Sequence, residues 1–236
     1  MVNGEKLITY VTGYGAVYNP SNASIQLSSL TEKAAAARTV NEQVNDLIAK
    51  NANAIAARDQ AFVPLKPLST RILNAVKASN VPKQVVDNAV TNNRKIQGQR
   101  ASPKLTEEEK KALIAKGATV NEKTSAQLGF DNLLDSLDKQ LKVLATIPQY
   151  APNEVDLQLA TLTALYNDLL AKNREVINNN ALLSTLRLNR DKILYDAETG
   201  LVALALDTKN YVKSVFGSTS PQFKQISGIT LKKIKA

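Results

Sequence analysis

The feature of this 236-residue chain that most restricts its fold is a faint internal duplication, at an offset of 132 residues. Both copies open with a Tyr-x-Pro turn, which spans residues 18–20 in the first copy and 150–152 in the second. Further matches follow in the same register: Gln26, Leu27, Leu30, Thr31, Asn41, Val44, Arg58 and Asp59 recur as Gln158, Leu159, Leu162, Thr163, Asn173, Val176, Arg190 and Asp191. A fixed offset of this kind indicates two equivalent structural pieces.

A second match competes with this register. Residues 45–51 resemble residues 167–173, at an offset of 122. Because this alternative needs an insertion and a compensating deletion inside one helix, we interpret it as convergent helix chemistry and keep the ungapped offset.

Apolar residues recur at heptad spacing in both copies, which is typical of amphipathic helices. The pattern predicts long helices near residues 23–60 and 155–195, each about 55 to 60 Å long at 1.5 Å per residue. Composition agrees, since aromatic residues make up only 5% of the chain and just 9 Gly and 8 Pro interrupt it. The stripe predicts burial of Leu30, Val44, Leu162 and Val176.

Shorter helices complete the prediction. Breaks at residues 64–67 and 196–200 follow the long helices. A capped start at Thr106 and a glycine at Gly117 bound a short helix between the copies. The remaining predicted helices cover residues 68–78, 83–93, 125–147 and 201–215, while the second copy ends in a turn over 217–223 and residues 226–234 carry the one trace of strand alternation.

Together these patterns predict an all-α fold, an elongated helical bundle built from two repeated helical hairpins with an intervening helix. The expected segments are an N-terminal piece, a first repeat, connecting helices and a second repeat, packed as one domain. Their bounds are residues 1–17, 18–104, 105–149 and 150–236.

The composition excludes most catalytic and metal chemistry. The chain has no Cys, His or Trp, so thiolate nucleophiles, disulfides, imidazole bases and the usual transition-metal ligands are absent. The glycine cluster at residues 12–15 lacks the rest of a nucleotide-binding fingerprint and predicts a turn. We therefore expect no enzyme, no cofactor and no metal; an enzyme with a carboxylate or lysine site is the third hypothesis.

Two sets of carboxylates are the candidates for such a site. The repeated Arg58-Asp59 and Arg190-Asp191 pairs recur in register near the ends of the long helices, and their simplest role is a salt bridge or a cap that holds the turn. Acids at Asp131, Asp135 and Asp138 fall on neighbouring turns of one helix, as on a solvated face.

The net charge of +9 is unevenly distributed. Residues 64–104 carry +7 and residues 208–236 carry +6, whereas residues 1–63 are neutral and 105–207 carry −4. If the repeats pack as similar hairpins, the two basic blocks meet in one basic pole. The predicted partner-binding residues of this pole are Lys83, Arg94, Lys95, Arg100, Lys104, Lys213, Lys224, Lys232, Lys233 and Lys235.

The N-terminus has only a short apolar run at residues 7–11, which does not match a signal peptide, and no apolar stretch approaches the roughly 20 residues of a membrane span. We expect a cytoplasmic protein, although a chain without cysteine leaves the redox compartment open.

Several segments carry a family resemblance, namely residues 12–15, 18–22, 94–98, 147–154 and 211–217. They resemble a family of uncharacterised helical proteins from Bacteroidota over nearly the whole chain. The resemblance implies one intact domain family and a bacterial cytoplasmic setting, and it implies no activity, cofactor or site.

The functional hypothesis is a non-enzymatic helical bundle that acts by self-association or by binding a partner, in a structural or scaffolding role. The alternative is a nucleic-acid-associated protein that contacts phosphates through the basic blocks without reading sequence. A third interpretation of the basic blocks is a solvated surface that keeps the protein soluble.

Overall fold

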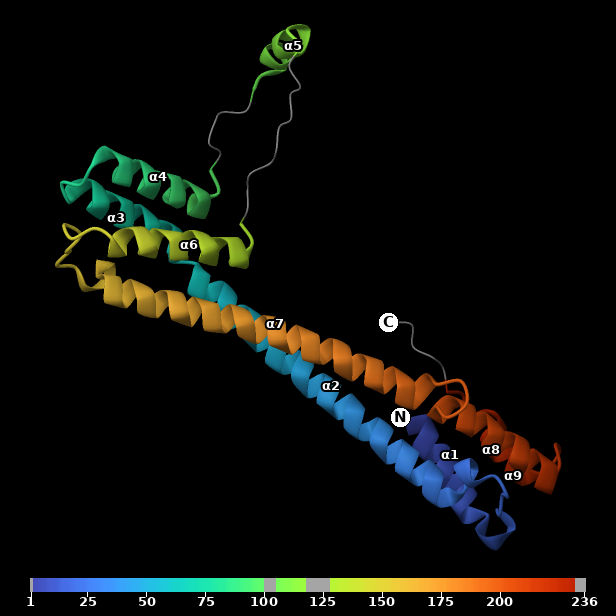
Figure 1. The fold of residues 1–236 in the computed structure, drawn as a ribbon. Coiled ribbons are helices and arrows are strands. Elements are labelled where there is room, and N and C mark those ends of the chain that lie inside the picture. The colour runs from blue at the N-terminus through green and yellow to red at the C-terminus, as the bar shows by residue number, and fades with distance from the viewer. Residues whose placement is uncertain (1, 100–104, 118–127, 232–236) are drawn as a thin grey trace. The chain divides into compact units, whose positions relative to one another are not determined.

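The computed structural model describes residues 2–99, 105–117 and 128–231, and every regular element within them is a helix (Figure 1). The all-α class predicted from the sequence is therefore confirmed. The chain divides into two compact units: unit 1 combines Met1–Ala52 with Asn178–Ala236, and unit 2 is Asn53–Ile177. The boundary between the units falls inside the two long helices.

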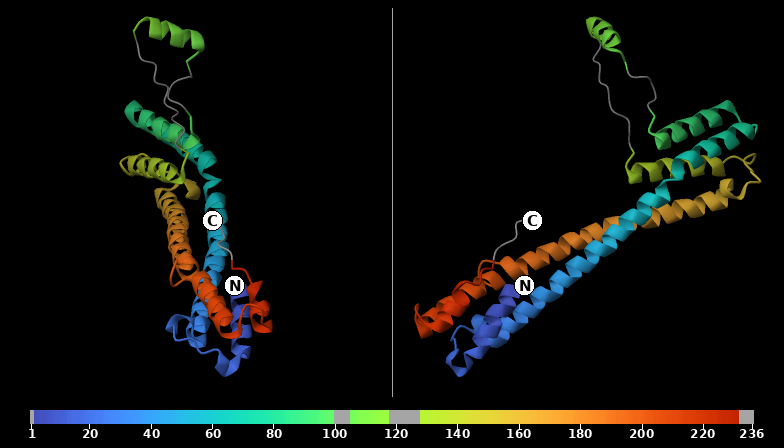
Figure 2. Two further views of the ribbon diagram at one scale, coloured as in Figure 1. Left: turned by 90° about the vertical axis from the view of Figure 1, so that its right-hand side faces the viewer. Right: turned by 180° about the vertical axis from the view of Figure 1, so that it is seen from behind.

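Unit 1 is built from both ends of the chain. Helix α1 contacts α8 and α9, and α8 packs along α9 (Figure 2). The elements of this unit are α1 (Val2–Gly13), the 3₁₀ turns η1 (Gly15–Val17) and η2 (Ala23–Ile25), the N-terminal part of α2 (Leu27–Phe62), the C-terminal part of α7 (Leu159–Tyr195), α8 (Leu201–Phe216) and α9 (Pro221–Ser227).

Unit 2 is a continuous stretch of chain, in which α4 packs against both α3 and α6 (Figure 1). Its elements are the C-terminal end of α2, then α3 (Leu65–Ala78), α4 (Lys83–Gln97), α5 (Glu107–Ala115), α6 (Phe130–Ala145), the 3₁₀ turn η3 (Val155–Leu157) and the N-terminal part of α7. No residue of α5 is buried.

The two copies of the duplication have matching local structure. In each copy a 3₁₀ turn precedes the long helix, and η2 and η3, like the starts of α2 and α7, lie 132 residues apart. Buried residues continue the heptad pattern on both long helices, and the four residues predicted to be buried, Leu30, Val44, Leu162 and Val176, all are. The predicted starts at residues 23 and 155 are wrong, because Gln26 and Gln158 are extended and separate the turns from the helices.

Neither unit coincides with one copy of the duplication. Unit 1 joins the first part of the first copy to the last part of the second, and unit 2 joins the remaining parts. The same kinds of element therefore meet in each unit: a helix before the Tyr-x-Pro turn, halves of both long helices, and the two helices that follow a long helix. This division differs from the consecutive segments that the sequence predicts.

Each unit has its own apolar core. In unit 2, Ile72, Ile96, Leu137 and Leu162 from four helices are completely buried together. The core of unit 1 that joins the chain ends is carried by Leu7, Val11, Val212, Ile226 and Ile229, among others. In unit 1, α2 and α7 also meet through Val44, Leu47 and Leu183.

Several predicted boundaries need correction. Residues 2–13 form α1, because Leu7 and Val11 pack into the unit 1 core. Helix α3 begins at Leu65, since Pro67 falls in its first turn, where the missing N–H needs no partner. The predicted turn at 217–223 gives way to α9, which ends at Ser227 and leaves no strand in the described part of 226–234.

Helix α4 extends four residues beyond the predicted end and stops at Gly98, where φ is +72°. A side chain at this position would be strained, and it would also collide with Leu128. Helix α6 starts at Phe130 with Gly129 as its N-cap, whereas the predicted start at residue 125 lies outside the described residues. The predicted cap of α5 is confirmed, since Thr106 and Glu109 form a reciprocal capping box.

Candidate interaction surfaces

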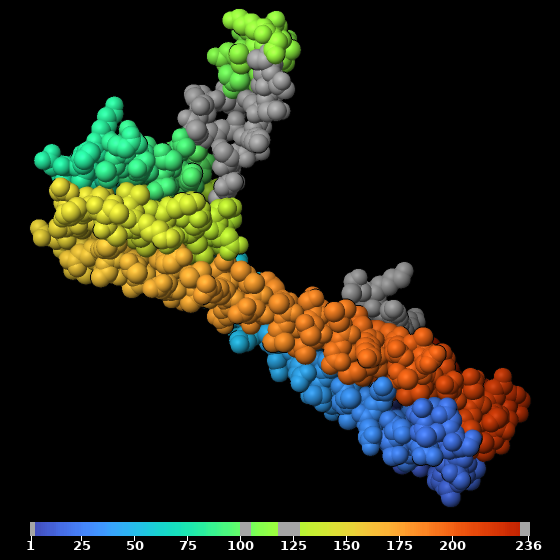
Figure 3. Space-filling view, viewed as in Figure 1, coloured from blue at the N-terminus to red at the C-terminus, as the bar shows by residue number. Residues whose placement is uncertain are grey.

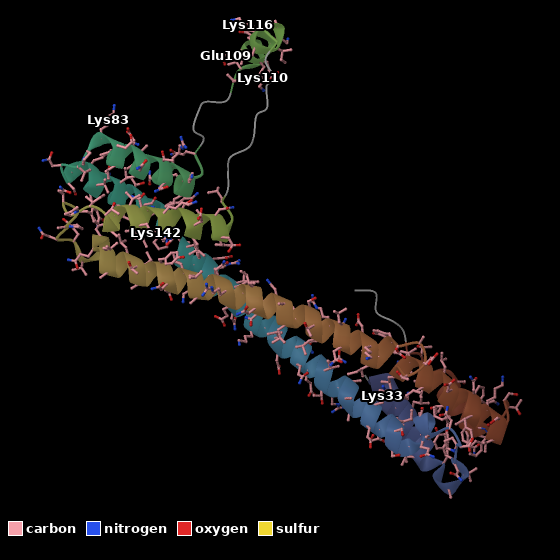
Figure 4. The ribbon with its side chains drawn as sticks, in the orientation of Figure 1. Lys33, Lys83, Glu109, Lys110, Lys116 and Lys142 are labelled. Atoms are coloured by element: carbon pink, nitrogen blue, oxygen red, sulfur yellow. The ribbon has the colours of Figure 1, made fainter. Side chains whose placement is uncertain are left out.

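The basic residues predicted in the first block lie on α4 of unit 2. Lys83 is the first residue of the helix (Figure 4), and Arg94 and Lys95 stand in its last turn. Cations in a last turn interact favourably with the negative end of the helix dipole, which is one local reason for their presence. None of the three forms an ion pair with any residue that the structure describes.

The second basic block lies in unit 1. Lys213 stands in the last turn of α8 with its ammonium 5.9 Å from the centre of the Phe223 ring, and Lys224 is exposed in the last turn of α9. The other predicted residues, Arg100, Lys104, Lys232, Lys233 and Lys235, lie outside the described residues. Because the two blocks belong to different compact units, neither unit holds the whole basic pole, which stays a prediction.

An uncharged surface lies on the C-terminal half of α7 in unit 1. Between residues 178 and 189 the only charged residue is Arg187, although charged residues make up 22% of the chain. Leu188 is 70% exposed and Leu182 is 51% exposed. We call the following exposed set the α7 outer face: Asn178, Ala181, Leu182, Thr185, Leu188 and Asn189.

The helical spacing places these residues on one side of α7. Ala181, Thr185 and Leu188 follow the i, i+4, i+7 pattern of a single helix face. The hydroxyl of Thr185 donates to the carbonyl oxygen of Ala181 at 3.2 Å, so its hydrogen is already bonded within the helix. In the space-filling view this part of α7, in orange, is turned towards the viewer (Figure 3). Sequence reasoning did not single out this face, although its low charge was a readable signal.

Each of the repeated carboxylates forms a salt bridge, which is one of the two predicted roles, with the arginine that precedes it in the chain. In both copies the guanidinium donates through Nε and one terminal nitrogen to a single oxygen of the next residue: Arg58 to Asp59 at 3.2 and 3.1 Å, and Arg190 to Asp191 at 3.0 and 2.8 Å. Arg58 also lies over the ring of Phe130, 3.8 Å from its centre. The matched geometry is that of an interaction that holds the arginine side chain.

The acids of α6 also have partners. Lys139 and Lys142 pair with the carboxylates one turn earlier, Asp135 and Asp138, at 2.5 and 2.6 Å. The amide of Asn173 donates to Asp131 at 2.7 Å. No group of His, Cys, Asp or Glu residues in the described part of the chain has the arrangement of a metal site.

A hollow of about 270 Å³ opens in unit 1 where η2 and α2 begin and where α7 turns into α8. Ala23, Ser24, Ser29, Lys33, Thr199 and Leu204 line it. The turn beside it is held by Asp196, whose carboxylate accepts from both N–H and hydroxyl of Thr199 and from the N–H of Glu198. The backbone donor at Thr199 is the main reason that the pKa of Asp196 is lowered.

The Tyr-x-Pro turns share a buried hydrogen bond. Tyr18 donates its hydroxyl hydrogen to the carbonyl of Ile25, and Tyr150 donates to the carbonyl of Leu157. Burial raises the pKa of Tyr18, and it raises the pKa of Tyr150 to about 12, to which the charges of Asp156 and Glu154 add.

Comparison with known proteins gives no relative from which a function could be transferred. No family model matches the chain, no curated protein matches it, and no solved structure matches it. Among the described helices none combines the length and the apolar character needed to cross a membrane.

Proposed function

We propose that this protein acts without catalysis, by associating with a second copy of itself through the α7 outer face. The supporting observation is the uncharged surface itself. On it, Leu182 is 51% exposed and Leu188 is 70% exposed. Single exposed leucines are ordinary, but an uncharged helix face with several apolar residues is typical of a helix-packing surface.

A second copy is the occupant that this surface fits best. In a twofold dimer the same patch meets itself, so a patch whose charges are all of one sign would face like charges. The α7 outer face avoids that repulsion because it carries no charge, whereas the basic surfaces of α4 and α9 would repel their own copies. Two α7 helices could pack antiparallel, with Ala181 and Thr185 small enough for close approach and the leucines interlocking beside them.

Salt distinguishes this contact from the one first suggested by the sequence. A contact between the basic pole of one copy and the acidic middle of another weakens as salt rises, because screening shortens to about 8 Å at 0.15 M. Association through the α7 outer face strengthens, since salt screens the repulsion between copies that each carry +9.

Light scattering on nucleic-acid-free protein, over a range of concentrations at low and high salt, tests the proposal. We expect a dimer that is better populated at high salt and that Leu188→Lys disrupts, while Gln43→Lys, a change at an exposed position on α2, leaves it intact. A protein that is monomeric under all conditions contradicts the proposal. A dimer lost at high salt favours the basic pole, which reversal of Lys232, Lys233 and Lys235 to Glu would then test.

The second candidate function is sequence-independent contact with nucleic acid. It is supported by Lys83, Arg94 and Lys95 of α4, whose charges have no carboxylate partner among the described residues. Binding to unrelated duplex DNA and single-stranded RNA should then be similar, with a linear fall of log K against log salt. Binding that depends on sequence, or no binding at low salt, would exclude this function. In either case we propose a cytoplasmic setting.

A further inference from the structure

The hollow at the start of α2 and α8 brings one lysine and two serine hydroxyls together. We propose that it binds a phosphoryl group, either free phosphate or the phosphate of a monoester. Its volume of about 270 Å³ leaves room for the phosphate and for the first atoms of whatever carries it.

Lys33 supplies the positive charge. This residue of α2, labelled in Figure 4, is half-buried and lines the hollow. Among the residues that the structure describes, none forms an ion pair with its ammonium. A partly desolvated cation without a counter-ion is stabilised by an incoming anion.

Two serine hydroxyls and the starts of two helices also lie at the hollow. Ser24 and Ser29 line the hollow from η2 and from the first turn of α2, and their hydroxyls make no hydrogen bond within the described structure. Neither α2 nor α8 has an acid in its first turn, and the N-cap of α8, Gly200, provides no side-chain hydrogen bond. Neither helix therefore carries an anion within its own first turn, although the Asp196 carboxylate lies just before the N-cap of α8.

The duplication provides an internal comparison. The residue equivalent to Ser24 in the second copy is Asp156, which forms an ion pair with Arg71 in unit 2. The residue equivalent to Lys33 is Leu165, which packs against the unit 2 core. Unit 2 thus carries its own anion at this place, whereas unit 1 has a cation, hydroxyls and open space.

The available donors suit a phosphate. Ser24 comes from the 3₁₀ turn and Ser29 and Lys33 come from the first turns of α2, whereas Thr199 on the approach to α8 already donates to Asp196. A planar carboxylate offers two oxygens in one plane, whereas a phosphate offers oxygens in several directions. Two acids lie in the turn beside the hollow: the carboxylate of Asp196 accepts from the N–H groups of Thr199 and Glu198, and Glu198 itself is exposed.

The test is a titration of the full chain with inorganic phosphate at constant ionic strength, followed by the amide signals in ¹⁵N–¹H spectra. We expect saturable shifts at Ser24, Ser29 and Leu201. Lys33→Gln should weaken binding by about tenfold or more, the loss expected when one charge-assisted hydrogen bond is removed, and Lys33→Arg should retain it. Lys50→Gln is the matched control, because it removes the same charge from an exposed position on the same helix.

A second variant guards against an effect of Lys33 on folding. Ser24→Asp places the anion of unit 2 at the exposed equivalent position in unit 1 and should abolish binding without disturbing the helices. Parallel titrations with glycerol 3-phosphate and with phosphatidic acid vesicles identify the source of the phosphoryl group. The proposal is overturned if the shifts do not saturate, if acetate produces them equally well, or if Lys33→Gln and Ser24→Asp leave them unchanged.

Discussion

Tyr150 donates its hydroxyl hydrogen to the carbonyl oxygen of Leu157, at 2.8 Å, and so closes the turn that leads into α7. Tyr18 and Ile25 form the same bond in the first copy, at 2.5 Å, before α2. All four residues are buried. The repeated bond fixes each Tyr-x-Pro turn against the 3₁₀ helix that follows it, and the two long helices consequently start at equivalent positions.

The buried phenol of Tyr150 predicts a loss of stability in alkali. Its pKa of about 12 in the folded protein exceeds the ordinary value of 10.0, so the fold favours the neutral phenol. Its contribution is complete below pH 10 and is lost as pH rises towards 12, because the unfolded chain releases the proton first. Urea unfolding across this range should show a smaller alkaline decrease in Tyr150→Phe than in wild type.

Tyr10→Phe is the control for this experiment, since the Tyr10 hydroxyl has no hydrogen-bond partner among the described residues. It should follow the wild-type pH dependence. An identical alkaline decrease in Tyr150→Phe would show that this phenol is not protected by the fold.

The core position of Leu162 can be tested by truncation. Leu162 is completely buried in unit 2, so Leu162→Ala should lower the free energy of unfolding by about 2 to 5 kcal/mol. Val155→Ala, in the same unit but at a side chain that is 69% exposed, should change it by less than about 0.5 kcal/mol. Similar values for the two variants in chemical denaturation would contradict the assignment of the heptad stripe.

The two Arg-Asp pairs should contribute unequally to the stability of the protein. Asp59→Asn and Asp191→Asn should each change stability by no more than about 1 kcal/mol, because their side chains are 55% and 43% exposed and water screens the ion pairs. Arg58→Gln should be more harmful than Arg190→Gln, by about 0.5 to 2 kcal/mol, because Arg58 also lies over Phe130.

Thermal unfolding of the four variants provides this comparison. Equal losses of stability in Arg58→Gln and Arg190→Gln would show that the contact of Arg58 with Phe130 does not contribute to stability. An activity that disappears in Asp59→Asn or Asp191→Asn at unchanged stability would instead support the enzyme hypothesis.

The chain segments that make up each unit predict that the protein stays folded when the backbone is cleaved between the two copies. Unit 1 needs both Met1–Ala52 and Asn178–Ala236, so the two fragments cannot separate without dismantling it. A protease site placed after Gly117, next to α5, which has no buried residue, should be cleaved while helix content is retained and the fragments migrate together. Fragments that separate without denaturant would contradict the assignment of the chain ends to one unit.

Much of the fold could be predicted from the sequence, because heptad spacing and breaking residues are local signals. Leu30 and Leu162 were placed correctly in the core by periodicity alone. Helix α1 was missed because its stability comes from tertiary contacts of Leu7 and Val11 rather than from a strong local pattern. Periodicity of apolar residues also could not reveal that Gln140 of α6 is buried.

The candidate surfaces could be predicted from the sequence less well than the helices. The hollow of unit 1 brings Lys33 together with Thr199, which is distant in the sequence, and only the packing of α8 beside η2 creates that proximity. The basic pole rested on the expectation that the two repeats pack as similar hairpins. The units combine parts of both copies, with the first basic block in unit 2 and the second in unit 1, and the pole stays a prediction.

The most direct test of self-association uses the absence of cysteine from the chain. A single Thr185→Cys variant places a thiol at the middle of the α7 outer face, where a twofold dimer brings the same residue of two copies together. Oxidation should yield a disulfide-linked dimer at protein concentrations where Gln43→Cys, on α2, stays monomeric. Denaturing electrophoresis without reductant that shows no Thr185→Cys dimer, or equal amounts for both variants, would contradict association through this face.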